Sequence, residues 1–166
     1  MDGGVEIDYA DYSCVLDPPT LDNANFQDLK RYWDAKRGSR AMPGRSDIDP
    51  VELRRHLGSL ILLDVLHGCD DYRYRLIGSK VVQAYGRDST GKTVRTLLAN
   101  TEEQYVEVTL DAYRSVARRR TTALTSGSLK VVKRDFVRFE CLMLPLGSHD
   151  DRVDIILVEQ LFFRQA

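Results

Sequence analysis

The sequence predicts an α+β fold: a five-stranded antiparallel sheet with inserted helices and an N-terminal helical cap. Residues 25–37 carry apolar side chains at helical spacing. Several later stretches alternate apolar and polar residues, as half-buried strands do. Turns of a few residues separate the last three of these stretches, and connections that short join antiparallel neighbours.

The composition is that of one ordinary globular domain. The chain has 166 residues, of which 43% are hydrophobic and 30% charged, and its formal net charge is −1. These values exclude disorder, collagen and coiled coil as descriptions of the whole chain. The longest apolar runs, residues 60–63 and 155–158, are far shorter than the roughly 20 residues of a membrane span. The start also lacks the basic and apolar regions of an export signal, so we expect a cytoplasmic protein without a membrane span.

Cysteine and histidine usage argues against disulfides and metals. The three cysteines form no C-x-x-C pair, and the three histidines lack H-x-H and H-E-x-x-H spacing. Residues 67–71, His-Gly-Cys-Asp-Asp, contain metal-ligand types, but a tight turn favours the same residues. The sequence therefore predicts no metal site.

Charge divides the chain into an arm and a body. Residues 1–22 hold six acids and no Lys or Arg, whereas 19 acids oppose 24 bases in the remainder. Two prolines, Pro18 and Pro19, mark the end of the acidic arm. We therefore expect an acidic N-terminal arm at 1–22, a helical cap at 23–59 and the sheet domain at 60–166.

The cap is predicted to hold two helices. Residues 25–37 form the first, and Gly38 ends it. Residues 49–52, Asp-Pro-Val-Glu, have the capping acid, early proline and capping-box acid of a second helix start. That second helix is expected to bury Leu53, Leu57 and Leu60.

The rest of the chain is predicted to supply the sheet and its inserted helices. Residues 60–66 and 72–77 form a hairpin, and residues 79–85 form a short helix. The acids of residues 102–120 precede the bases, which complements the dipole of one long helix. Three antiparallel strands follow, at about 122–132, 136–146 and 153–163. The two groups of strands then lie side by side.

Four segments resemble the stand-alone bacterial PAS proteins, in which one PAS domain forms almost the whole chain. They read YWDAKRGSRAMPGRSDIDPVELRRHL, LILLDV, DYRYRLIGSKVVQAYGRDSTGK and LMLPLGSHDDRVDIIL. The match runs from about Phe26 to Phe163. It implies the PAS fold, with the PAS core at 60–166, and a sensory or partner-binding role in signal transduction. We therefore expect a bacterial module that is not an enzyme and that has no output domain of its own, since no chain is left to encode one. The resemblance names neither ligand nor signalling partner.

One motif favours a different class of protein. Residues 86–93, GRDSTGKT, fit the phosphate-binding pattern G-x-x-x-x-G-K-[ST]. A phosphate loop follows a buried strand and needs a parallel sheet, but residues 80–85 have a helical pattern and the rest of the chain reads as antiparallel. A P-loop nucleotide-binding protein is the first alternative to a ligand-binding sensor. A ligand-free adaptor for protein–protein interaction is the second.

The resemblance also bears on cofactors. PAS domains that hold haem usually present a His from the long helix, and residues 102–120 contain none. Light-sensing relatives that bind flavin place a reactive Cys before that helix, and residues 86–101 contain none. Ordinary haem and photoreactive flavin are therefore disfavoured, and the cofactor is unknown.

An apolar cavity between the sheet and the long helix is the predicted ligand site. Tyrosine hydroxyls would supply its few polar groups, and Cys141 is expected to be a small buried side chain. The predicted lining for a small apolar ligand is Tyr74, Leu76, Val82, Tyr85, Tyr113, Val137, Phe139, Cys141, Met143, Ile155 and Leu157.

A basic segment is the predicted partner surface. Six Lys and Arg residues crowd into residues 30–45, opposed there by Asp34 alone. The body is only mildly basic, which argues against nucleic acid and favours an acidic protein surface or the acidic arm. The helix at residues 26–37 is also a candidate homodimer contact. The partner-surface candidates are Arg37, Arg40, Arg45, Arg138 and Glu140.

Overall fold

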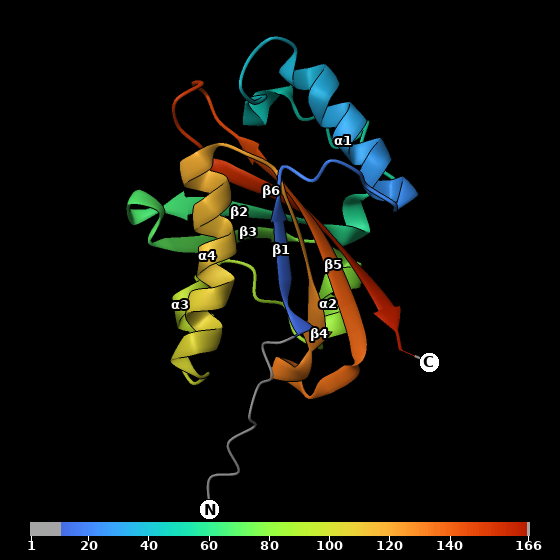
Figure 1. Cartoon of the computed structure of the whole chain (residues 1–166), viewed down its shortest axis with the longest axis vertical. Helices are drawn as coiled ribbons and strands as arrows, with labels where there is room; N and C mark the ends of the chain where they lie inside the picture. Colours follow the sequence, from blue (N-terminus) through green and yellow to red (C-terminus); the bar gives the residue numbers. More distant parts are fainter. Residues whose placement is uncertain (1–10, 166) are drawn as a thin grey trace, which may run out of the picture.

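The computed structural model describes residues 11–165, apart from the side chain of Val131. These residues form one antiparallel sheet in the order β1-β4-β5-β6-β2-β3, with helices packed on it (Figure 1). The strands are β1 (Ser13–Leu16), β2 (Leu60–Leu66), β3 (Asp71–Ile77), β4 (Ala123–Leu129), β5 (Arg134–Leu146) and β6 (Ile155–Arg164). The α-helices are α1 (Ala24–Arg37), α2 (Ser79–Tyr85), α3 (Val94–Leu97) and α4 (Glu103–Arg119).

The arrangement predicted for the last five strands is confirmed. The β2–β3 hairpin joins the β4–β5–β6 group through antiparallel pairing of β2 with β6, in which Leu60 lies opposite Glu159 and Asp64 opposite Ile155. The inserted helices α2, α3 and α4 connect β3 to β4. A chain that leaves β3 must cross the sheet to reach β4, so these helices lie over one face of it.

The expectation of a separate acidic arm at residues 1–22 is wrong for its described part. Residues 13–16 form β1, a sixth strand, which pairs with β4 from Ser13 opposite Ser126 to Leu16 opposite Ala123. The prediction rested on the number of acidic residues and overlooked residues 12–16, Tyr-Ser-Cys-Val-Leu, whose side chains suit a strand. An edge strand has unpaired backbone groups, and β1 satisfies those of β4. Residues 1–10 lie outside the described residues.

The first cap helix is confirmed and the second is not. Asn23 caps α1 by accepting a hydrogen bond from the Asn25 amide at 2.9 Å. Gly38 ends α1 with a φ of +60°, which glycine adopts without strain. Residues 50–56 form turns, followed by a 3-10 turn at 57–59. Pairing of Leu60 with β6 outweighs the local helix signals, because a helix extended that far would remove the first residue of β2.

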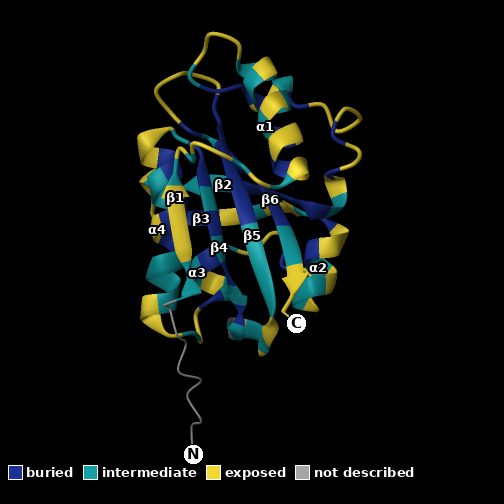
Figure 2. Ribbon diagram, turned by 45° about the vertical axis from the view of Figure 1, so that its right-hand side comes forward, coloured by how far each residue is buried: buried dark blue, intermediate teal, exposed yellow. Residues whose placement is uncertain are grey.

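The two faces of the sheet carry different layers. Phe139, Cys141 and Met143 of β5 project toward α2 and α4, as the shared lining of the cavity described below shows. The intervening Leu142 and Leu144 are fully buried on the opposite face. That face packs against α1, whose buried residues are Phe26, Leu29 and Trp33. Figure 2 shows that β5 is buried at the end near α1 and becomes more exposed at the other end.

Candidate functional site

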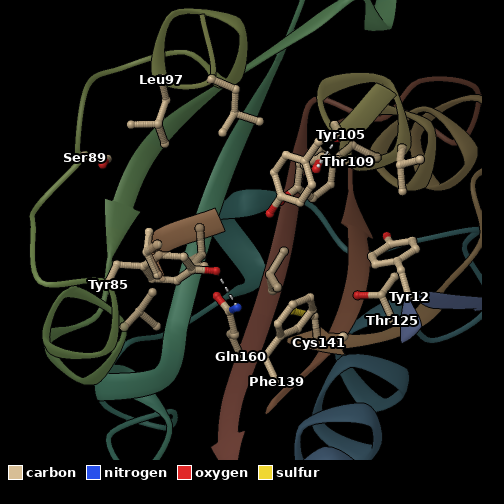
Figure 3. Close-up of a pocket in the computed structure, with 18 of the residues that line it drawn as sticks. Tyr12, Tyr85, Ser89, Leu97, Tyr105, Thr109, Thr125, Phe139, Cys141 and Gln160 are labelled. Atoms are coloured by element: carbon tan, nitrogen blue, oxygen red, sulfur yellow. Dashed lines mark hydrogen bonds between the residues drawn. The ribbon is translucent and has the colours of Figure 1, made fainter. Parts of the chain in front are cut away.

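A cavity of about 120 Å³ lies between the sheet and the helices of its inner face (Figure 3). β5 and β6 form its floor, β3 and α2 one side, and α4 its cover. Most of the lining is apolar, with hydroxyl and amide groups inserted at intervals. This combination is typical of small-molecule sites, in which apolar walls bind the ligand body and a few polar groups orient it.

Six of the residues expected in the cavity line it. They come from β3, α2, α4 and β5, so the fold brings together side chains that are far apart in the sequence. These six are Tyr74, Tyr85, Tyr113, Phe139, Cys141 and Met143. Their role in binding a ligand stays a prediction.

Five residues expected in the lining lie outside it: Leu76, Val82, Val137, Ile155 and Leu157. On β6 the prediction was one residue out of phase, because Val158 and Gln160 line the cavity and the odd-numbered residues point to the opposite face, where Glu159 contacts His56. On α2 the prediction was right for Tyr85, but Val81 and not Val82 lines the cavity beside it.

The two strand residues Leu76 and Val137 have separate explanations. An irregularity of pairing places Leu62 opposite Leu76 but Leu63 opposite Tyr74. This bulge puts Tyr74 on the inner face and leaves Leu76 41% exposed. Val137 pairs with Arg164, at the end of β5 beyond the cavity.

Several cavity residues were missed by the sequence reasoning. Tyr105 and Thr109 lie eight and four positions before Tyr113 on α4, so helical periodicity applied from Tyr113 would have found both. Thr125 and Gln160 follow from the alternation of β4 and β6 once the correct phase is known. Tyr12 had no such signal, because the acidic composition assigned it to the arm.

A buried hydrogen bond crosses the cavity. Gln160 of β6 is 4% exposed, and its Nε2 donates to the hydroxyl of Tyr85 on α2 at 2.9 Å (Figure 3). The ring of Tyr85 also meets Phe162 edge to face, with 6.1 Å between centroids. The side chain of Gln160 therefore links the floor of the cavity to one of its helices.

The buried tyrosines and the cysteine of the cavity keep their protons at physiological pH. Burial raises the pKa of Tyr74 to about 12 and the pKa values of Tyr85 and Tyr113 well above the ordinary value. Burial also raises the pKa of the Cys141 thiol to about 12. A protonated thiol is a poor nucleophile. The interior is thus suited to hold a ligand through apolar contact and hydrogen bonds rather than to react with it.

The opposite face of β6 holds a buried charged cluster under the cap. Nδ1 of His56 lies 2.9 Å from Oε1 of Glu159, and its Nε2 lies 2.9 Å from Oδ2 of Asp28 on α1. His56 and Glu159 are 5% and 1% exposed. Burial lowers the pKa of His56, but its hydrogen bonds to both carboxylates outweigh burial and leave that pKa raised. Burial raises the pKa of Glu159 despite the opposing contact with His56.

The basic cap residues proposed as a partner surface are engaged within the cap. Arg37 Nη2 lies 3.4 Å from Asp34, and Arg40 Nη2 lies 2.9 Å from Asp47. Arg45 donates to the carbonyl of Ile48 at 3.1 Å. These contacts hold the loop after α1 in place. Their role toward a partner stays a prediction.

The two β5 residues of the proposed partner surface alternate along the strand with Phe139 and Cys141, which line the cavity. Arg138 lies opposite Phe163 and contacts Asp11, with 3.5 Å between Nη1 and the carboxylate. Glu140 lies opposite Leu161 and is half-buried. Among residues 11–165, no hydrogen bond or ion pair links Arg138 or Glu140 to the partner-surface arginines of the cap.

The segment 86–93 does not have the geometry of a phosphate loop. The amide of Gly91 donates to Tyr74 at 2.7 Å, that of Lys92 to Ser89 at 3.1 Å, and that of Thr90 to Asp88 at 2.9 Å. These amides are used within the fold and are not free to bind phosphate oxygens. The helix that follows, α3, has four residues, and the sheet is antiparallel throughout. This finding overturns the nucleotide-binding alternative.

The described part of the chain contains neither a metal-binding cluster nor a membrane-spanning helix. Among residues 11–165, no group of three or more His, Cys, Asp or Glu is placed to hold a metal ion. Within the same residues, no helix has the length and apolarity to cross a membrane.

The chain is thus a small α+β domain in which helices cover one face of an antiparallel sheet and enclose a cavity against it. The PAS domain family model matches residues 21–158, so the chain belongs to the PAS domain family and this single domain accounts for nearly all of it. The resemblance drawn from the sequence is thereby confirmed. Membership of this family makes a sensory signalling role the general expectation. No curated protein matches the sequence.

Two solved structures are similar to the chain. One is described as an RNA-binding light-oxygen-voltage receptor, with a TM-score of 0.52 and 15% identity over 90% of this chain. The chain spans 38% of the length of that receptor, and at this identity the likeness shows the fold alone. The other is the RsLOV d2 variant, with a TM-score of 0.41 and 14% identity, covering 86% of this chain and 69% of that one.

Proposed function

We propose that this PAS domain senses a small molecule in its cavity and transmits the binding through β6 to the cap, whose altered docking changes a surface for a signalling partner. The proposal needs two populated arrangements of the cap and a ligand that binds one of them better. It draws on the cavity on one face of the sheet, the cap on the other, and β6, whose successive residues contact both.

Two successive residues of β6 carry the proposal. Gln160 faces the cavity and donates to Tyr85, whereas Glu159 faces the cap and binds His56. Neighbouring residues of a strand point to opposite faces, so a displacement of the backbone at one is transmitted to the other. A ligand that takes the place of Gln160 as the partner of Tyr85 acts directly on the strand that anchors the cap through Glu159 and His56.

Native mass spectrometry of the protein as purified from cells tests for the ligand. We expect added mass that leaves on denaturation, and its value begins to identify the molecule. The same spectrum distinguishes a monomer from the homodimer considered from the sequence. A bare mass that stays bare after incubation with cell extract metabolites would overturn the sensing proposal.

A cavity-filling variant provides the matched comparison. Val108 lines the cavity from α4, so Val108→Trp should remove the bound mass. Val51 is 68% exposed and lies outside the lining, so Val51→Trp adds the same bulk and should leave the bound mass unchanged. Retention of the mass by the Val108 variant would place the ligand elsewhere.

A ligand-free adaptor is the second candidate function. Phe136 and Phe163 are 54% and 41% exposed. They lie at the start of β5 and the end of β6. Exposed aromatic side chains are frequent anchors of protein–protein contacts. For an adaptor, Phe163→Ser would abolish partner binding while Val108→Trp would leave it intact; for the proposed sensor, the cavity variant would also change it.

A further inference from the structure

The charged residues of the cavity lining carry one excess positive charge. They are Asp11, Arg87 and Lys130, one acid against two bases. The carboxylate of Asp11 is 4.0 Å from Lys130 Nζ and 3.5 Å from Arg138 Nη1, so its charge is already offset. The guanidinium of Arg87 forms no ion pair or hydrogen bond with any residue in the range 11–165.

The position of Arg87 brings its charge into the cavity mouth. It directly follows Gly86, which ends α2 in a left-handed conformation, and it lies in the lining while remaining exposed. Its positive charge also reaches the hydroxyl of Tyr74, where it partly opposes the effect of burial on the pKa. An exposed arginine at a mouth is therefore within electrostatic reach of a group bound inside.

The interior behind Arg87 offers no countercharge. The tyrosines and Cys141 keep their protons because burial raises their pKa values. A cavity of about 150 Å³ accommodates a molecule the size of benzene, and this one measures about 120 Å³. The space is of the same order and slightly smaller, so it limits the apolar body of a ligand to one small ring or a short acyl chain, with any charged end left at the mouth.

We propose that the cavity binds a small monocarboxylate, with its apolar body among the tyrosines and its carboxylate paired with Arg87. This inference rests on the proposed function and adds the chemical class of its ligand. A planar guanidinium binds a carboxylate through two parallel hydrogen bonds, which accounts for an unpaired arginine at this place. A cationic ligand would meet the excess positive charge, and a nucleotide would not fit the volume.

Titrations with matched acid and amide probes test the inference. Benzoate, cyclohexanecarboxylate and hexanoate are compared with benzamide, cyclohexanecarboxamide and hexanamide by calorimetry at pH 7. The side-chain amide signals of Gln160 in ¹⁵N NMR spectra report binding inside the cavity. We expect at least one acid to bind more tightly than its amide and to shift these signals.

Variants at Arg87 and at a distant arginine complete the design. In Arg87→Gln the acid should bind about 10- to 100-fold more weakly, as expected for loss of a hydrogen bond to a charged group, while the amide is unchanged. Arg54 is exposed and outside the lining, so Arg54→Gln should bind as the original protein does. An unchanged NMR spectrum of each free variant shows that the fold is retained.

The outcomes separate this inference from the proposed function. If amides bind as tightly as acids, or if Arg87→Gln affects neither, the monocarboxylate assignment is wrong and ligand sensing stands. If no probe binds and the purified protein carries no added mass, both are wrong. Weaker acid binding in Arg87→Gln with unchanged amide binding supports both.

Discussion

The imidazole of His56 contacts the carboxylate of Glu159 at 2.9 Å in a place from which both side chains have lost almost all contact with water. His56 belongs to the turn that leads out of the cap, and Glu159 belongs to the central strand β6. The second nitrogen of His56 reaches Asp28 on α1 at the same distance. This pair is therefore the charged connection between the cap and the sheet.

We expect His56→Ala to lower the free energy of unfolding by about 3 kcal/mol, because it leaves the carboxylate of Glu159 buried without its partner. Asp28→Ala should cost less than about 1 kcal/mol, because the Asp28 side chain is 61% exposed. Urea unfolding of the two variants and the original protein measures both. Equal losses in the two variants would show that burial of Glu159 is not the main contribution.

The same pair predicts that stability declines as pH rises. The pKa values of His56 and Glu159 are both raised in the folded protein, so the folded state holds more protons than the unfolded state. The contribution of His56 is fully present below its ordinary pKa of about 6.5 and is lost as pH rises through the higher folded value. Glu159 contributes in the same direction, starting above its ordinary pKa of about 4.3.

Urea midpoints between pH 6 and 8.5 measure this decline, and His56→Gln should flatten it. The exposed Asp28 acts in the opposite sense at the acid end. Its pKa is lowered, chiefly by the hydrogen bond to His56, so its stabilising contribution is lost as pH falls through the lowered value. If the stability of His56→Gln declined with rising pH as steeply as that of the original protein, other groups would be responsible for the decline.

Loss of the Gln160–Tyr85 hydrogen bond should be felt in the cap. Gln160→Leu removes the donor from β6. We expect the backbone amides of α1 to exchange with solvent about fivefold faster, because the free energy of local opening falls by about 1 kcal/mol. Thr109→Val alters another polar cavity residue, on α4, whose hydroxyl bonds within its own helix, and should leave α1 unchanged. Hydrogen exchange followed by mass spectrometry compares the two. Equal exchange of α1 in both variants would contradict transmission through β6.

Lys92 is expected to be dispensable. In a phosphate loop this lysine would contact nucleotide, whereas here its backbone bonds to Ser89 and Tyr74. We expect Lys92→Ala to change stability by less than about 0.5 kcal/mol, and neither protein to bind a fluorescent ATP analogue. Nucleotide binding that disappears in Lys92→Ala would contradict the geometry of the loop.

Much of the fold could be predicted because several signals are local. The bounds of α2 agree with the prediction, and those of β2 do too. Gly38 ends α1 as expected, because a glycine in the left-handed region depends on only a few neighbouring residues. The second cap helix failed for the converse reason, since distant pairing of Leu60 with Glu159 outweighed the local signals of residues 49–52.

The candidate site was predicted where the strand phase was right and missed where it was wrong. Phe139, Cys141 and Met143 alternate without interruption and line the cavity together. On β6 both faces are apolar enough to be buried, so sequence alone did not distinguish Leu157 from Val158. On β3 a bulge separated Tyr74 from Leu76, and such an irregularity arises from pairing between strands rather than from either strand alone.

The sequence by itself determined the fold class, the family and the mostly apolar, tyrosine-containing character of the predicted cavity, because these depend on composition, periodicity and local motifs. Only the tertiary structure decided that residues 13–16 complete the sheet, that Arg87 stands unpaired at the cavity mouth, and that Glu159 and Gln160 face the cap and the cavity. The physical reason is that pairing register and charge neutralisation depend on partners distant in the chain. Their identity is established only when the sheet has assembled.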